Sequence, residues 1–248
     1  MKEIKIQAMP EKVIVEYVDR PLNLPEAIRK SQEEYWQKRT EENPTLKNGV
    51  IYCIGEAEHS SEKLHIQVQK TDYMHYLYTI NHPGCDYPCR VIYTCAAVHT
   101  NDSHFIFGQM NKHTSTPHRL QFAGGGIDET DLNGTCFDLE ENIKREIQEE
   151  MGLNPEQYRI RPMYLKSGGE YDHWAVIFEC KTQLNIEQVK TVFEQHSIAI
   201  IKEGKQPEFS ELIILQDNPD TISKFVKGNT QPKVDYLVPY LSSSLSLQ

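Results

Sequence analysis

Three glutamates lie close together in one short segment of this chain, where they could hold a metal ion. Glu146, Glu149 and Glu150 occupy positions i, i+3 and i+4, so a helix would present all three on one face. Like charges at this spacing repel one another, and a divalent cation would relieve that repulsion. Mg²⁺ and Mn²⁺ take oxygen ligands and often share them with substrate phosphates. The cluster therefore predicts a Mg²⁺ site, with Mn²⁺ as the alternative, whereas a bare cluster outside such a context is usually a solvated helix surface.

The residues around the cluster predict the helix that must position it. Asp138 can serve as the N-cap, and Glu141, three residues later, can complete a capping box. Gly152 suits the position that ends a helix. Apolar residues recur every fourth position beside the acidic face and form a stripe for packing: Leu139, Ile143, Ile147 and Met151. We therefore expect an amphipathic helix from Asp138 to Met151.

The segment from Arg145 to Leu153 resembles the second half of the Nudix box, the signature of the Nudix hydrolase superfamily. The box reads G-x5-E-x7-R-E-U-x-E-E-x-G-U, where U is apolar, and every defined position of its second half is matched. The first half differs. Gly126 lies 19 positions before Arg145, whereas the pattern has 14, and Phe137 stands where the upstream glutamate belongs. The resemblance thus implies a preserved catalytic helix preceded by an atypical, longer loop.

The resemblance also implies a set of roles. Glu146, Glu149 and Glu150 would be the metal ligands, and Glu149, Glu150 and Arg145 the catalytic residues. The bound cation would neutralise a diphosphate and activate water for attack on phosphorus. In the family, the box arginine typically orients the upstream glutamate, so Phe137 leaves Arg145 in need of another partner.

Residues upstream of the helix are candidates for binding the substrate. Gly125 and Gly126, in a run of three glycines, would let the backbone turn tightly and approach phosphates. Lys112 and Arg119 belong to a basic loop that could meet the same phosphates, although such a loop is more often simply exposed.

Two assignments stay open on the sequence alone. The partner of Arg145 could be Glu129, Asp131 or Asp138. The general base is unassigned among five residues of two loops: Glu129, Asp131, Glu170, Asp172 and His173.

Composition narrows the class of protein. The chain has 248 residues, of which 38% are hydrophobic and 25% charged, and its net charge is −10. This acidic balance disfavours a nucleic-acid groove. No apolar run approaches the ~20 residues of a membrane span, and the first residues lack the apolar core of a signal peptide. We expect a cytoplasmic protein with no nucleic-acid or membrane partner, whose six cysteines stay reduced.

The element pattern predicts an α/β (α+β) fold, and the resemblance implies a Nudix-type α/β/α sandwich with an N-terminal α+β extension or small domain. Strand and helix candidates interleave from residue 91 onward. The proline-rich stretch 82–90 suggests a linker. We expect an N-terminal α+β region at 1–85, a Nudix domain at 86–241 and a disordered tail at 242–248.

Two functions are consistent with these features of the sequence. The first is a pyrophosphatase that acts on a nucleoside diphosphate linked to another group, with a UDP-sugar or ADP-ribose as the substrate. The UDP-sugar expectation comes from an N-terminal string that is similar to the UDP-glucose/UDP-galactose pyrophosphatase branch and includes Trp36, Arg39, Asn43-Pro44, Asn48-Gly49 and Thr71-Asp72-Tyr73. The second is a catalytically weak Nudix domain that serves as a nucleotide-binding or regulatory module. Phe137 and the longer loop motivate it, and the intact glutamates argue against it.

Overall fold

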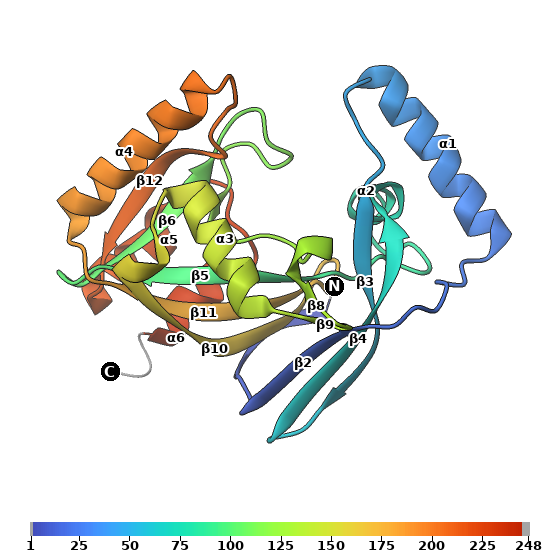
Figure 1. Cartoon of the computed structure of the whole chain (residues 1–248), viewed down its shortest axis with the longest axis horizontal. Helices are drawn as coiled ribbons and strands as arrows, with labels where there is room; N and C mark the ends of the chain where they lie inside the picture. Colours follow the sequence, from blue (N-terminus) through green and yellow to red (C-terminus); the bar gives the residue numbers. More distant parts are fainter. Residues whose placement is uncertain (1, 245–248) are drawn as a thin grey trace.

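The computed structural model describes residues 2–244, which form two β-sheets with helices around them (Figure 1). The strands are β1 Lys2–Ala8, β2 Lys12–Tyr17, β3 Val50–His59, β4 Lys63–Asp72, β5 Ile92–His99, β6 His104–Met110, β7 Leu120–Gln121, β8 Leu132–Asn133, β9 Cys136–Phe137, β10 Tyr158–Gly169, β11 Trp174–Thr182 and β12 Phe209–Gln216. The helices are α1 Glu26–Glu42, α2 Tyr73–Asn81, α3 Leu139–Met151, α4 Ile186–Lys202, α5 Pro219–Gly228 and α6 Leu237–Ser244, with short 3-10 helices η1 Glu129–Asp131 and η2 Pro155–Gln157.

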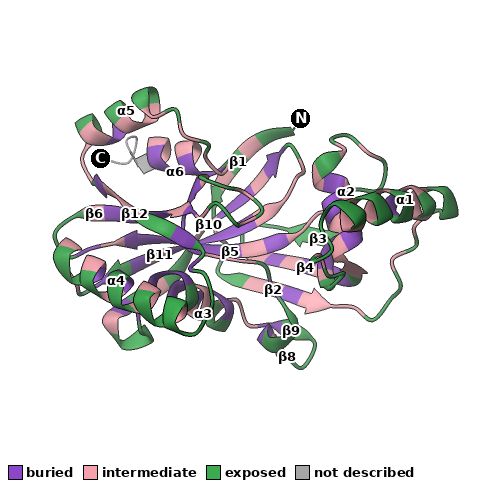
Figure 2. Ribbon diagram, turned by 90° about the horizontal axis from the view of Figure 1, so that it is seen from above, coloured by how far each residue is buried: buried purple, intermediate pink, exposed green. Residues whose placement is uncertain are grey.

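The larger sheet is the middle layer of a sandwich. Its strands follow the order β1-β10-β11-β5-β6-β12, and β7 pairs with β6. Figure 2 shows α3 and α4 on one face of this sheet and α5 and α6 on the other. The mixed α/β fold class expected from the sequence is therefore confirmed, and its layers are α/β/α.

Each face of the larger sheet has its own hydrophobic core. Ile143, Ile147 and Met151 of α3 are fully buried in the core on the first face. Ile222 of α5 and Leu237 of α6 are buried in the core on the second face. Strand β5 lies between them, parallel to β11, and most of its residues are buried. Burial on both faces explains why this strand reads as a continuous apolar run rather than an alternating one.

The smaller sheet carries the N-terminal helices. Its strand order is β3-β4-β2-β9-β8, and α1 and α2 lie beside it (Figure 1). The tyrosine-rich segment after Thr71-Asp72 forms α2, and the Asp72 side chain caps its N-terminus by accepting a hydrogen bond from the backbone N–H of His75. Tyr35 of α1 meets Tyr78 of α2 edge to face, with ring centroids 5.8 Å apart.

Strands pair across the boundary expected after residue 85. β1 pairs antiparallel with β10 and is thus a strand of the larger sheet. In the other direction, β8 and β9 join the smaller sheet through the pairing of Cys136 with Glu16. The separation of 1–85 from 86–241 stays a prediction, and both sheets contain residues from each side of it.

The C-terminal part of the chain differs from the expected tail. Helix α6 continues to Ser244, so residues 242–244 are helical rather than disordered. Residues 245–248 of that expected tail lie outside the described residues. Within the described range, no helix is both long and apolar enough to cross a membrane.

Candidate functional site

Helix α3 forms over the residues that its sequence predicts, with Asp138 as the N-cap but without the expected capping box. The Asp138 side chain accepts hydrogen bonds from the backbone N–H groups of Glu140 and Glu141. The carboxylate of Glu141 pairs with Lys144 at 2.7 Å. At the other end, Gly152 adopts a φ of 74°, and its N–H donates to the carbonyl of Gln148. The caps fix the ends of the helix, and the buried apolar stripe fixes which face turns outward.

Two of the three glutamates pack against the glycine run 124–126. The Glu150 carboxylate accepts a hydrogen bond of 2.7 Å from the backbone N–H of Gly124. A Cβ on Gly125 would lie 2.5 Å from a carboxylate oxygen of Glu146, so only glycine leaves room for that side chain. A Cβ on Gly124 would lie 2.1 Å from the backbone carbonyl oxygen of Thr94, so the chain needs glycine at position 124 as well as at 125. A Cβ on Gly126, in contrast, would meet nothing within 4 Å.

The two carboxylates are buried and crowded. Burial raises the pKa of Glu146 to about 7, where Arg145 opposes the rise and Glu149 and Glu208 add to it. Burial also raises the pKa of Glu150 well above its usual range, and repulsion from Glu208 adds to that rise. Hard oxygen donors that are costly to ionise without a counter-charge suit a divalent cation.

Glu208 is a functional candidate that the sequence did not reveal. It directly precedes β12, and its carboxyl group lies near that of Glu150 and raises the pKa of Glu150. Its backbone carbonyl accepts a hydrogen bond of 2.7 Å from Asn111, which ties the segment to the start of the basic loop. No motif surrounds Glu208 in the sequence, so only the fold could bring this fourth carboxylate to the cluster.

Glu149 lies apart from the other two glutamates of the helix. Its side chain is 61% exposed, and its carboxylate is 3.7 Å from a guanidinium nitrogen of Arg145. Across residues 2–244, no three His, Cys, Asp or Glu side chains are already grouped in a way that could hold a metal ion. The roles assigned to Glu146, Glu149 and Glu150 as a metal-binding set therefore stay a prediction.

Asp131 is the main partner of Arg145 among the alternatives left open by the sequence. The guanidinium lies 3.1 Å from one Asp131 oxygen and 3.2 Å from the other, and 2.8 Å from Glu146. Asp128 lies slightly farther away, at 3.4 Å. Glu129 instead pairs with Lys70, and Asp138 caps the helix. Arg145 thereby links the loop to the acidic face of α3.

A buried asparagine extends this network to the glycine run. The Asn142 side chain is fully buried and donates hydrogen bonds to Asp131 at 2.9 Å and to the carbonyl of Gly126 at 3.1 Å. Its side-chain oxygen accepts a hydrogen bond from Thr94 of β5. Buried polar groups connected in this way hold one another in a defined geometry.

The longer loop has a structural use. Residues Leu132–Asn133 and Cys136–Phe137 pair as the hairpin β8–β9, which extends the smaller sheet. Phe137 is buried there, and its ring packs against Tyr52 of β3 at 4.7 Å between centroids. Phe137, at the position of the family's glutamate, is thus an apolar anchor. Asp131, which directly precedes the hairpin, supplies a carboxylate instead.

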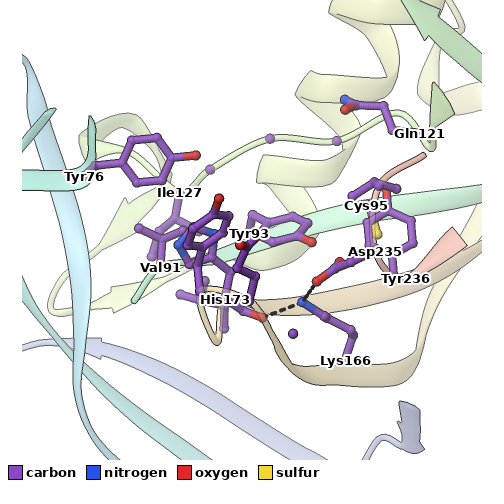
Figure 3. A pocket seen from close by; sticks show the side chains of 18 of the residues that line it. Tyr76, Val91, Tyr93, Cys95, Gln121, Ile127, Lys166, His173, Asp235 and Tyr236 are labelled. Atoms are coloured by element: carbon purple, nitrogen blue, oxygen red, sulfur yellow. Dashed lines mark hydrogen bonds and ion pairs between the residues drawn. The ribbon is translucent and has the colours of Figure 1, made fainter. Parts of the chain in front are cut away.

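A cavity of about 670 Å³ adjoins the glycine run (Figure 3). Its wall contains Gly124, Gly125 and Gly126, and the first two of these also contact the carboxylates of Glu150 and Glu146. The remaining wall comes from both sheets and from α2, and it includes aromatic and charged side chains: Tyr52, Tyr76, Tyr93, Arg119, Lys166, Tyr171, His173, Lys233, Asp235 and Tyr236. A ligand in this space could therefore contact the glycine run directly.

The expected substrate-binding residues separate into two groups. Gly125, Gly126 and Arg119 line the cavity, and Arg119 donates hydrogen bonds to the side-chain oxygen of Gln121. Lys112 is exposed on its loop and is absent from the cavity wall.

The candidates for the general base are also dispersed. Glu170 and His173 line the cavity, whereas Asp172 forms a salt bridge with Lys2 at 2.7 Å. Asp131 and Glu129 are engaged by Arg145 and Lys70. Burial, together with the positive charge of Lys166, lowers the pKa of His173 to about 4, so its ring is neutral at pH 7.

Several solved structures of Nudix family proteins are similar to this chain, with TM-scores below 0.5. A mutT/nudix family protein from Listeria innocua is 11% identical, with a TM-score of 0.41 over 63% of this chain and 92% of that one. The NUDIX domain of NrtR from Shewanella oneidensis, solved with ADP ribose, is 11% identical, with a TM-score of 0.40 over 69% and 96%.

An Ap4A hydrolase from C. elegans is a further structural neighbour. It is 13% identical, with a TM-score of 0.39 over 63% of this chain and 96% of that one. No family model and no curated protein sequence matches the chain. The features of this chain that bear on function are therefore its own: the segment Arg145–Leu153, the glycine run and the cavity beside them.

Proposed function

We propose that this chain is a Nudix-type pyrophosphatase that hydrolyses a nucleoside diphosphate linked to another group, with a UDP-sugar as the substrate. The observation that carries the proposal is the position of the glycine run. It touches the carboxylates of Glu146 and Glu150 and also lines the cavity. A ligand in the cavity would place its diphosphate beside the cluster, where electrostatic stabilisation of the transition state is strongest.

The acidic cluster fits a divalent cation. Glu146, Glu149 and Glu150 would hold Mg²⁺, or Mn²⁺ in its place, and Glu208 adds a carboxylate near Glu150. The bound cation supplies charge neutralisation and activation of water. Arg145, held by Asp131, would keep Glu146 oriented toward the glycine run. Arg119 would offer its guanidinium to the phosphate oxygens.

Direct assays test the proposal. Purified protein would be incubated with Mg²⁺ and a panel of UDP-sugars, ADP-ribose and dinucleoside polyphosphates, and the phosphomonoester products would be measured. We expect a UDP-sugar to give UMP and a sugar 1-phosphate, and EDTA to abolish the reaction. A preference for adenine nucleotides would replace the UDP-sugar with ADP-ribose as the substrate.

The second candidate is a nucleotide-binding or regulatory module, and Phe137 is the observation that favours it. The structure gives Phe137 a packing role and gives Arg145 another carboxylate, which weakens that argument. Binding of a nucleotide without turnover of any member of the panel would favour the module. A cytoplasmic location and the absence of a nucleic-acid partner stay predictions.

A further inference from the structure

The cavity has two chemically different ends. At one end, the rings of Tyr76, His173 and Tyr171 form an aromatic wall (Figure 3 shows the first two). Tyr76 stacks on His173 with centroids 5.6 Å apart and planes 24° apart, and Tyr171 lies 5.5 Å from His173 on a tilted plane. The polar end begins at His173, whose backbone carbonyl accepts a hydrogen bond from Lys166, and the buried Lys166 forms an ion pair there with the more exposed Asp235. A substrate that fills both ends must itself have an aromatic part and a polar part.

We propose that the aromatic wall binds the nucleobase and that the Lys166–Asp235 pair binds the hydroxyl groups of the sugar. This inference rests on the proposed function, because a nucleotide sugar carries its diphosphate between these two parts. The glycine run, which also lines the cavity, would then face the diphosphate. A volume of about 670 Å³ lies within the range of pockets that enclose ligands of this size.

An unpaired polar atom supports a ligand at the aromatic end. The Nε2 atom of His173 is buried and has no hydrogen-bond partner among the described residues. His173 lines the cavity. Buried polar atoms are nearly always paired in folded proteins, so an orphan in this wall indicates a missing partner. The edge of a nucleobase offers neighbouring donors and acceptors, and its face extends an aromatic stack.

At the polar end, Lys166 and Asp235 lie close to each other and to the neighbouring backbone. Lys166 is only 1% exposed, and its ammonium group donates to Asp235 at 2.6 Å and to the backbone carbonyl of His173 at 3.0 Å. Gly169 has a φ of 88°, and a Cβ there would lie 2.4 Å from the Asp235 carboxylate. Only glycine therefore permits this pair to sit against the loop.

Unused bonding capacity at this end matches a sugar hydroxyl. An ammonium group has three donors, and the two hydrogen bonds of Lys166 leave one free. The second oxygen of Asp235 has no hydrogen-bond partner within residues 2–244. A charged donor beside a charged acceptor binds hydroxyl groups, because a hydroxyl both donates and accepts.

Binding of the two product halves tests this assignment without catalysis. UMP and glucose 1-phosphate would be titrated separately into the Mg²⁺-containing protein, with calorimetry as the readout. We expect Tyr76→Ala to weaken UMP binding by about tenfold, the scale of one lost base–aromatic stack, and to leave glucose 1-phosphate unaffected. Tyr76→Phe, which keeps the ring, should retain UMP binding.

The polar end has its own variant. Asp235→Asn should weaken the binding of glucose 1-phosphate by about tenfold, because it removes the charged acceptor. The binding of UMP should be unaffected. If this variant proves unstable, Asp235→Glu keeps the charge and displaces the carboxylate by one methylene group. The exposed residues Tyr87 and Asp220 give matched controls, since Tyr87→Ala and Asp220→Asn make the same changes outside the cavity.

The outcomes separate this inference from the proposed function. The inference is supported if Tyr76→Ala weakens only the binding of UMP and Asp235→Asn weakens only the binding of glucose 1-phosphate. The inference would be overturned if both variants weakened the binding of the same ligand, or if neither variant changed binding. It would also be overturned if the wild-type protein bound neither ligand. Turnover of a UDP-sugar together with unselective variants would leave the hydrolase standing and refute the two-ended cavity. Selective effects of the variants on binding, without turnover of any member of the panel, would support the two-ended cavity and refute the hydrolase.

Discussion

At the scale of single residues, burial makes the carboxylates of the cluster costly to ionise, and this cost points to a role for their charge. Glu150 is buried beside Glu208, receives one hydrogen bond from Gly124 and has a strongly raised pKa. A neutral side chain of the same shape would suit the metal-free fold equally well, because a glutamine oxygen can still accept that bond. The metal-free fold therefore does not need a carboxylate at this position, whereas the proposed metal-binding role of Glu150 does.

Glu150→Gln should lower kcat by about two orders of magnitude or more, as is typical when one electrostatic group at a reacting centre is lost. The thermal unfolding midpoint of the metal-free protein should stay the same or rise. Glu141→Gln removes a carboxylate from an exposed position of the same helix and should leave kcat unchanged. Near-normal turnover of Glu150→Gln would remove this residue from the site.

His173 makes stability depend on pH. Its folded-state pKa of about 4 is below the usual 6.5, so the contribution of the neutral ring is complete above pH 6.5 and is lost as the pH falls toward 4. Between pH 7.5 and pH 5, we expect this residue to cost about 2 kcal/mol of unfolding free energy. Urea unfolding should show a smaller loss in His173→Gln than in wild type.

The exposed His59 provides the comparison for this experiment. His59→Gln should follow the wild-type pH profile. An identical profile in His173→Gln would show that the His173 ring is not held neutral by its surroundings.

At the scale of elements, the glycine run connects α3 to the cavity. Its backbone lies along β5, where the N–H of Thr94 donates to the carbonyl of Gly125 at 3.0 Å. Asn142 and Asp131 hold the same segment from the other side. The run is therefore a fixed strand-like segment that can orient a diphosphate against the acidic face of α3.

Gly125→Ala and Gly126→Ala should differ sharply in their effects. The added methyl group at 125 would collide with the Glu146 carboxylate, whereas the same group at 126 would enter open space. We expect a large fall in kcat/KM for Gly125→Ala and a small one for Gly126→Ala, measured in the same assay. Equal effects would mean that the position of Glu146 does not limit the reaction.

At the scale of the whole molecule, the N-terminal and C-terminal parts share one hydrophobic core. Val15, Ile66 and Val68 of the smaller sheet belong to the same buried cluster as Ile143 and Ile147 of α3. The cavity wall likewise includes Tyr76 from α2 and Tyr93 from β5. The N-terminal part thus completes the site that the proposed function requires.

The full chain should unfold in a single calorimetric transition because of this shared core. Ile66→Ala, deep in the smaller sheet, should lower the midpoint of that one transition and cost about 2–5 kcal/mol. Val50→Ala, at an exposed position of β3, should change it little. Two separate transitions, with only one shifted by Ile66→Ala, would show that the parts fold independently.

The sequence by itself determined the features that depend on neighbours along the chain. The spacing of apolar residues, the Asp138 cap and the Gly152 stop were sufficient to predict α3, since helix formation is governed by contacts within a few residues. The interleaved pattern of strand and helix candidates after residue 91 likewise predicted the α/β class. The acidic face of α3 and the glycine run were identified for the same local reason.

Only the tertiary structure decided which distant residues complete the site. Asp131 became the partner of Arg145 because the extra loop residues form a hairpin on the smaller sheet and turn Phe137 inward. Glu208 reached Glu150 through the position of β12, and the cavity took its two ends from strands and helices far apart in the chain. Pairing of distant strands sets these contacts, and one short motif carries no information about them.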